Sequence, residues 1–60
     1  MTIEECADHI GEPVVRRAAA LPAAEGILTH VDGFAYVRYG GEYVSTATAP
    51  ELLELAAGAR

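Results

Sequence analysis

Residues 27–48 decide the fold, and they read ILTHVDGFAYVRYGGEYVSTAT. Two dipeptides, Asp32-Gly33 and Gly40-Gly41, separate three runs that are rich in valine, threonine and aromatic residues. Such runs are typical of β-strands. Asp-Gly or Gly-Gly between them indicates a two-residue hairpin, since a type I′ turn needs positive φ at both central positions. The sequence therefore predicts a three-stranded antiparallel meander with strands over 27–31, 34–39 and 42–48.

The segment before the meander divides into a helix, a strand and a loop. Thr2 and Glu5 have the spacing of a capping box, in which each side chain binds the backbone N–H of the other residue. Apolar residues at spacings of three and four then indicate a helix over 3–10. Residues 14–17 have the β-branched composition of a first strand. The alanines of 18–25 favour a helix, but Pro22 breaks any run longer than one turn, so this segment is interpreted as a connecting loop that ends at Gly26.

The C-terminal segment allows two interpretations. Pro50 suits a first helical turn, and the leucines after it could complete an amphipathic helix over 50–57. Alternatively, a 3₁₀ turn over 50–52 leads into a short strand over 53–56. Periodicity does not separate the two, because the segment is too short.

The order of these elements resembles that of SH3-like small barrels of the Tudor and KOW kind. Three segments carry the resemblance, namely 25–31, 34–40 and 46–52. The chain is also similar to short uncharacterised proteins of actinobacteria and their phages, through Ile-Gly-x-x-Val at 10–14 and Tyr-Val-x-Tyr-Gly at 36–40. The resemblance implies the short final strand. It implies no activity, because one fold hosts many functions.

The expected fold is mainly β, with one domain over 1–60. It consists of a helix over 3–10 and an SH3-like small barrel of about five short antiparallel strands over 13–56. Strands of a barrel alternate between interior and exterior, so Ala35, Val37 and Tyr39 should share one face and Phe34, Tyr36 and Arg38 the other. The expected interior residues are Val15, Ile27, Val31, Ala35, Val37, Ala47, Leu52 and Leu55. The helix residues Ile3, Cys6 and Ile10 should close a barrel opening or cover Phe34 and Tyr36.

Charge and composition disfavour several classes of partner. Nine acidic and four basic residues give a formal net charge of -5. That field repels phosphate backbones, and Arg16 and Arg17 are the one adjacent basic pair, so nucleic-acid binding is disfavoured. No apolar run approaches the roughly 20 residues of a membrane span. The acidic first residues differ from a signal peptide, and the single cysteine fits a reducing compartment. We therefore expect a cytoplasmic protein, in the host cytoplasm if a phage encodes it.

No catalytic or cofactor-binding pattern is recognisable. Cys6, His9 and His30 lack the spacing of zinc ligands. The carboxylates near Cys6 would raise the pKa of its thiol, so this residue is expected to pack as a small apolar side chain. Ser45, the only serine in the sequence, lies within a predicted strand beside threonines. We expect no enzymatic activity, no metal and no cofactor.

The aromatic residues of the meander are the candidate binding feature. Tyr36, Tyr39 and Tyr43, with Arg38, are expected to form the contact surface of a non-enzymatic protein-interaction module. Tyrosine suits this role because it offers a large contact area at low cost in rotamer entropy. The alternative is that these rings form the core of a very small domain.

Three further hypotheses concern partners. A nucleic-acid-associated, KOW-like factor would need Arg16, Arg17 and Arg38 on one face. An acidic mimic or virion component would present the carboxylates near the N-terminus. An exposed strand edge or the helix face also predicts self-association into a homo-oligomer.

Overall fold

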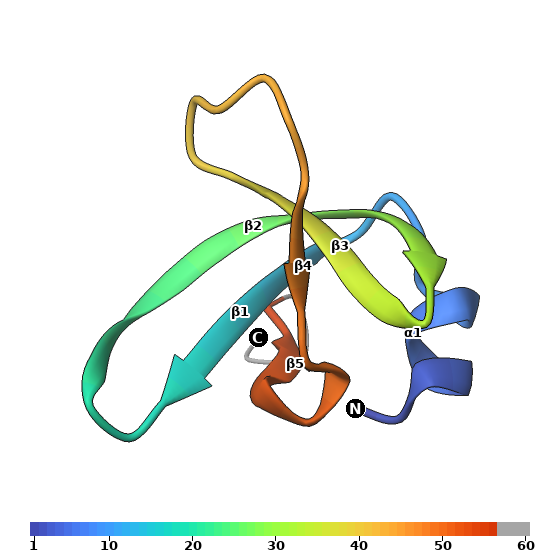
Figure 1. Ribbon diagram of the computed structural model, residues 1–60, viewed down its shortest axis with the longest axis horizontal. Coiled ribbons are helices and arrows are strands. Elements are labelled where there is room, and N and C mark those ends of the chain that lie inside the picture. The colour runs from blue at the N-terminus through green and yellow to red at the C-terminus, as the bar shows by residue number, and fades with distance from the viewer. Residues whose placement is uncertain (57–60) are drawn as a thin grey trace.

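One antiparallel sheet of five strands dominates the computed structural model, which describes residues 1–56. The elements are α1 (Ile3–Asp8), β1 (Pro13–Ala18), β2 (Leu21–Asp32), β3 (Phe34–Tyr39), β4 (Thr46–Thr48), the 3₁₀ turn η1 (Pro50–Leu52) and β5 (Leu53–Leu55). The strand order is β4-β3-β2-β1-β5, and the sheet is strongly curled, with β4 at one edge beside β3 (Figure 1). This confirms a mainly β fold with an N-terminal helix, and it confirms the 3₁₀ turn followed by a short strand.

Helix α1 begins as its sequence predicts but ends earlier. Thr2 and Glu5 form the capping box. The helix ends at Asp8, so the prediction of a helix to residue 10 was wrong. The reason is competition from the sheet, because Gly11 N–H donates to the carbonyl of Leu28 at 2.7 Å and draws the chain away from the helix. Ile10 is consequently 46% exposed and does not join the apolar stripe.

The capping box makes a prediction about pH. The Thr2 N–H donates to the Glu5 carboxylate at 2.7 Å, and this hydrogen bond is the main reason that the pKa of Glu5 is lowered from its ordinary value of 4.5. A carboxylate whose pKa is lower in the folded state than in the unfolded state stabilises the fold at pH values above its unfolded-state pKa. That stabilisation is lost as the pH falls through its folded-state pKa. Glu5→Gln should therefore destabilise the chain near pH 7 and match the wild type in strong acid. Thr2→Ala should cost about 1 kcal/mol at pH 7.

Urea titrations at pH 7 and at pH 3 or below measure both effects. Glu4→Gln serves as the control, because Glu4 lies in the same helical turn but is not part of the box. If the stabilities of Glu4→Gln and Glu5→Gln depended on pH in the same way, the pH effect would come from the general electrostatics of the helix dipole. It would then not come from the capping box.

The segment 18–25 belongs to a hairpin, which corrects the prediction of a loop. Ala18 pairs with Leu21 and Arg16 with Ala24, so β1 and β2 are joined by a two-residue turn. Pro22 is tolerated because the pairing is irregular between Arg16 and Ala18, and because β3 pairs with β2 only from Gly26 onward. Alanine and proline disfavour a strand locally, but the partner strand overrides that preference.

The meander of β2, β3 and β4 is confirmed, while its two turns differ from the prediction. At the first turn only Gly33 has positive φ (73°), so Asp32-Gly33 is not a type I′ turn. At the second, the chain leaves the sheet after Tyr39 and returns at Thr46, which makes a six-residue connection over 40–45. Gly40, with φ of 50°, starts this loop. The predicted strand over 42–48 is thus reduced to its last three residues.

The predicted interior was correct on β3, at Val31 and at Leu55, and one residue out of phase at four other positions. Ala35 and Val37 are fully buried as expected, and Val31 and Leu55 are half-buried against the core. Four predicted interior residues were wrong: Val15, Ile27, Ala47 and Leu52. The residues buried in their place are Val14, Leu28, Thr48 and Leu53. A shift of one residue exchanges the two faces of a strand, so a small error in register reverses the whole assignment.

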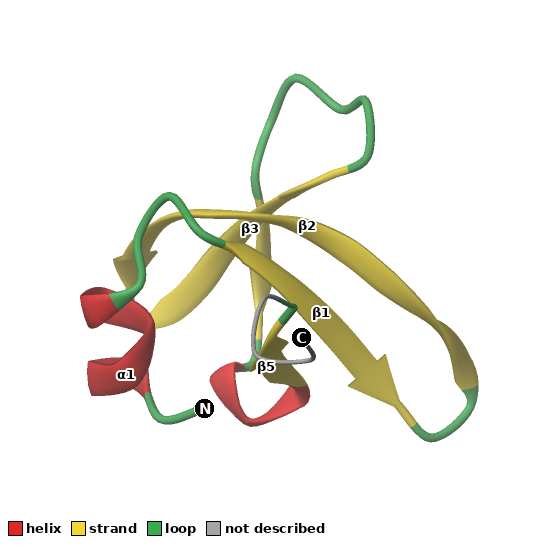
Figure 2. Cartoon of the chain, turned by 180° about the vertical axis from the view of Figure 1, so that it is seen from behind, coloured by secondary structure: helices red, strands yellow, loops and turns green. Residues whose placement is uncertain are grey.

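An irregularity in β2 explains one of these shifts. The register with β3 changes between Leu28 and His30, so that Leu28 and Val31 both face the interior although they are three residues apart. Cys6 of α1 is fully buried in the same core, while Phe34 is 52% exposed. The helix therefore closes one end of the curled sheet, beside the β2–β3 turn (Figure 2), and it leaves Phe34 exposed.

Candidate protein-binding surface

The four predicted site residues do not lie on one surface. Tyr36 and Arg38 occupy the outer face of β3, and Tyr39 lies on its inner face, half-buried against the core. Tyr43 is 98% exposed in the 40–45 loop. The structure therefore brings Tyr36 and Arg38 together on one face of the strand, places Tyr43 on the neighbouring loop and assigns Tyr39 to packing.

Tyr39 has two partners that explain its packing role. Its hydroxyl shares a 2.7 Å hydrogen bond with Thr48 Oγ1. Its ring lies 5.8 Å from the guanidinium carbon of Arg16, within the range of a cation–π contact. The first contact joins β3 to β4, and the second joins β3 to β1, from which it is separated by β2 in the sheet. Replacing Tyr39 would disturb the fold, which makes it a poor probe of binding.

Tyr36 is held by a neighbour on β2. Its ring stacks on that of His30, with ring centroids 4.4 Å apart and planes inclined by 9°. The two residues are cross-strand partners, and Ala47 of β4 lies on the other side of Tyr36. The small side chain of Ala47 leaves this stack uncovered from the β4 side. Sequence reasoning missed His30 because it weighed this residue only as a metal ligand.

The base of the 40–45 loop is tied to the sheet by Thr29. Its hydroxyl donates to the carbonyl of Tyr36 at 3.0 Å and lies 2.6 Å from the hydroxyl of Ser45. Beyond this anchor the loop projects away from the rest of the chain (Figure 1). Tyr43 and Val44 at its tip are 98% and 70% exposed. The loop thus holds two consecutive large side chains in solvent.

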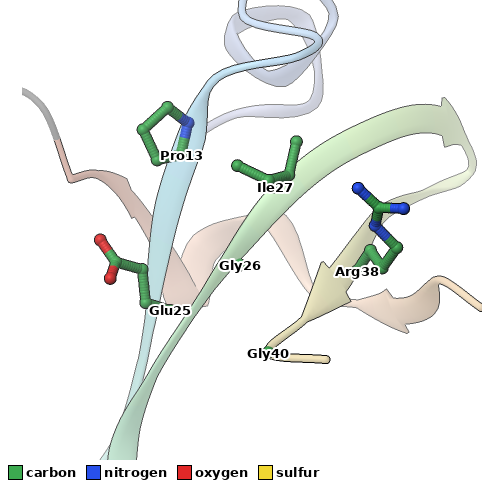
Figure 3. A pocket seen from close by; sticks show the side chains of 6 residues that line it. All are labelled: Pro13, Glu25, Gly26, Ile27, Arg38 and Gly40. Atoms are coloured by element: carbon green, nitrogen blue, oxygen red, sulfur yellow. The ribbon is translucent and has the colours of Figure 1, made fainter. Parts of the chain in front are cut away.

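A shallow depression of about 320 Å³ lies on the outer face, near the start of this loop. Its lining residues are Pro13, Glu25, Gly26, Ile27, Arg38 and Gly40 (Figure 3). They come from β1, β2, β3 and the loop, which explains why sequence reasoning found only Arg38. The others become neighbours because Pro13 pairs with Ile27 and Ile27 with Arg38.

The three described arginines have different surroundings. Arg16 donates to the carbonyl of Pro22 at 3.0 Å, and Arg17 forms an ion pair with Glu54. Within residues 1–56, Arg38 forms no ion pair or side-chain hydrogen bond. Because Arg16 and Arg17 are already engaged, the arrangement offers little support for a basic surface that would bind nucleic acid.

The nucleophilic and metal-ligating residues are dispersed. Cys6 is fully buried, and this burial raises the pKa of its thiol, with the Glu5 carboxylate adding to the effect. His9 pairs with Glu12 at 2.9 Å. Among residues 1–56, no three side chains of histidine, cysteine, aspartate or glutamate are grouped to hold a metal ion. The single α-helix in that range is too short to cross a membrane.

Comparisons with protein-family models, curated proteins and solved structures gave no match to this chain. Its class is therefore defined by its own architecture, a small five-stranded antiparallel sheet that is compatible with a small barrel and is closed at one end by a helix.

Proposed function

We propose that this chain is a non-enzymatic protein-interaction module that contacts its partner through Tyr43 and Val44 of the 40–45 loop. One observation carries the proposal: these consecutive residues are 98% and 70% exposed. Large apolar side chains in solvent contribute almost nothing to the folding of this chain. Burying each against a partner would contribute about 1.5–3 kcal/mol, and tyrosine is enriched among residues that dominate interfaces.

The anchoring of the loop supports the same proposal. The Thr29–Ser45 hydrogen bond restrains the end of the loop next to β4. At the other end, Glu42 N–H donates to the carbonyl of Tyr39 at 3.0 Å. A loop restrained at both ends loses less conformational entropy on binding than a free one, so more of the contact energy becomes affinity. Tyr36, stacked on His30, offers a second aromatic contact on the adjoining face.

We also propose that the fold is an SH3-like small barrel from an actinobacterium or one of its phages. The order of strands, the 3₁₀ turn before β5 and the segments 10–14 and 36–40 support this assignment. The contact surface proposed here rests on the exposed loop and does not depend on that kinship.

Site-specific photo-crosslinking in cells of the source organism tests the proposal. A photoreactive phenylalanine analogue at position 43 should give a discrete adduct with another protein. The same analogue at Glu4, an exposed position on α1, should not give that adduct. Val44→Ser should weaken the adduct from position 43 and leave the melting temperature unchanged, because its side chain is 70% exposed. The same adducts from positions 43 and 4, or none from position 43, would contradict the proposed function.

A further inference from the structure

We infer that the shallow depression on the outer face is a self-association surface that pairs two copies of this chain about a two-fold axis. This inference does not depend on the proposed role of the 40–45 loop. It rests on three properties of the depression: an apolar centre, opposite charges on its two sides, and the absence of partners for those charges within residues 1–56.

The apolar centre is Ile27. Ile27 on β2 has two cross-strand neighbours, Pro13 on β1 and Arg38 on β3. The backbones of Ile27 and Arg38 are therefore about 4.8 Å apart, which is the spacing of neighbouring strands. Glu25 lies two positions before Ile27 on the same face of β2, about 6.6 Å along the strand. Figure 3 shows Ile27 between the two charged side chains. A cation thus lies across the strands from one apolar residue, and an anion lies along the same strand as that residue.

This layout is self-complementary. Consider two copies packed face to face about a two-fold axis. The axis lies in the plane of the interface and passes near Ile27. It bisects the angle between the direction from Ile27 to Arg38 and the direction from Ile27 to Glu25. The rotation then brings Arg38 of each copy opposite Glu25 of the other and places the two Ile27 side chains together. In such an isologous contact every pairing occurs twice. One apolar contact and two ion pairs follow from a single operation.

The charges favour a second copy over other occupants. In the described part of the chain, neither Glu25 nor Arg38 takes part in an ion pair, whereas Arg17 pairs with Glu54 and His9 with Glu12. An acidic ligand would satisfy Arg38 and be repelled by Glu25, and a basic ligand would do the reverse. A second copy satisfies both charges. The formal net charge of -5 on each copy opposes any contact without such local complementarity.

The size of the surface indicates a weak dimer. A standard stable interface buries about 800 Å² on each partner, which is about a fifth of the 3899 Å² exposed by this chain. The depression is lined by six residues and is smaller than that. We therefore expect a dissociation constant on the order of 100 μM, in the range of transient contacts.

Sedimentation equilibrium of charge-reversal variants tests the inference. The wild type should dimerise as its concentration rises towards about 1 mM. Arg38→Glu and Glu25→Arg should each weaken the dimer at least about tenfold, because each creates two like-charge contacts. An equimolar mixture of the two variants should dimerise again, since every contact in the mixed dimer then joins opposite charges. That recovery requires position 38 of one copy to lie opposite position 25 of the other.

Two controls separate this geometry from net charge. Arg17→Glu is the control for Arg38→Glu, because both substitutions change the net charge by the same amount. Glu51→Arg is the control for Glu25→Arg for the same reason. Both controls should leave the dissociation constant within about twofold of the wild type. A wild type that stays monomeric at about 1 mM would overturn the inference, and so would a mixture that stays monomeric. If the double variant Tyr43→Ser/Val44→Ser no longer dimerised, the interface would lie on the 40–45 loop. That result would also overturn the inference.

Discussion

Leu28→Ala is expected to leave a large part of the chain unfolded at room temperature. Among residues 1–56, Leu28 has the largest side chain that is completely buried, and it packs in one core with Val14 and Val37. Removing a buried leucine to alanine costs about 2–5 kcal/mol, because transfer energy is lost and a cavity remains. At about 0.05–0.15 kcal/mol per residue, a chain of this size has only about 3–9 kcal/mol of stability in total.

Leu21→Ala is the matched control for this experiment. Leu21 lies on the same strand but is 56% exposed, so the identical substitution should change stability by less than about 0.5 kcal/mol. Urea titration followed by far-ultraviolet circular dichroism measures both variants. Equal effects at the two positions would contradict the placement of Leu28 in the interior, and with it the phase of β2 on which the outer face depends.

Gly26→Ala is expected to lower the melting temperature by about 4–24 °C, since an overpacked site costs about 1–3 kcal/mol and a domain of this size shifts by about 4–8 °C per kcal/mol. A Cβ on Gly26 would lie 2.6 Å from the carbonyl oxygen of Arg38 and 2.7 Å from Cγ1 of Val37. The first atom belongs to the backbone of β3 and the second to a buried side chain, so neither can move freely. The strands β2 and β3 would have to separate where they begin to pair.

Gly41→Ala gives the comparison. A Cβ at Gly41 would meet no atom within 4 Å, and Gly41 is not among the glycines with positive φ. The melting temperature should stay within a few degrees of the wild type, because the added methyl group meets nothing and alanine restricts the unfolded chain. Thermal unfolding by calorimetry measures both variants. A tolerated Gly26→Ala would contradict the close approach of β2 and β3 at Arg38.

The features that the sequence predicted correctly have local causes. The capping box of Thr2 and Glu5 acts within one helical turn, and Pro50 directs a 3₁₀ turn through its own backbone restriction. The reversal at Gly33 needs one residue that tolerates positive φ. The two faces of β3 followed from strict alternation, because its pairing with β2 and β4 keeps Tyr36 and Arg38 outside and Val37 inside. Each of these signals can be evaluated without knowing the partner strand.

The candidate surfaces also combine features that local spacing predicts with features that depend on tertiary contacts. That Tyr36 and Arg38 share a face was predictable from their spacing of two. The packing of Tyr39 under Arg16 was not, because it depends on how β1 crosses β3 in the curled sheet. Nor was the exposure of Tyr43 and Val44, since their segment has a strand-like composition yet lies in the 40–45 loop.

By itself, therefore, the sequence determined the number and order of the strands in the meander, the cap of the helix and the alternation of β3. Tertiary structure alone decided the pairing of β1 with 21–25, the irregularity after Leu28 and the assembly of the depression from Pro13, Ile27 and Arg38. The physical reason is that strand pairing joins residues distant in the chain. Its hydrogen bonds and burial outweigh the weak local preferences of alanine and proline.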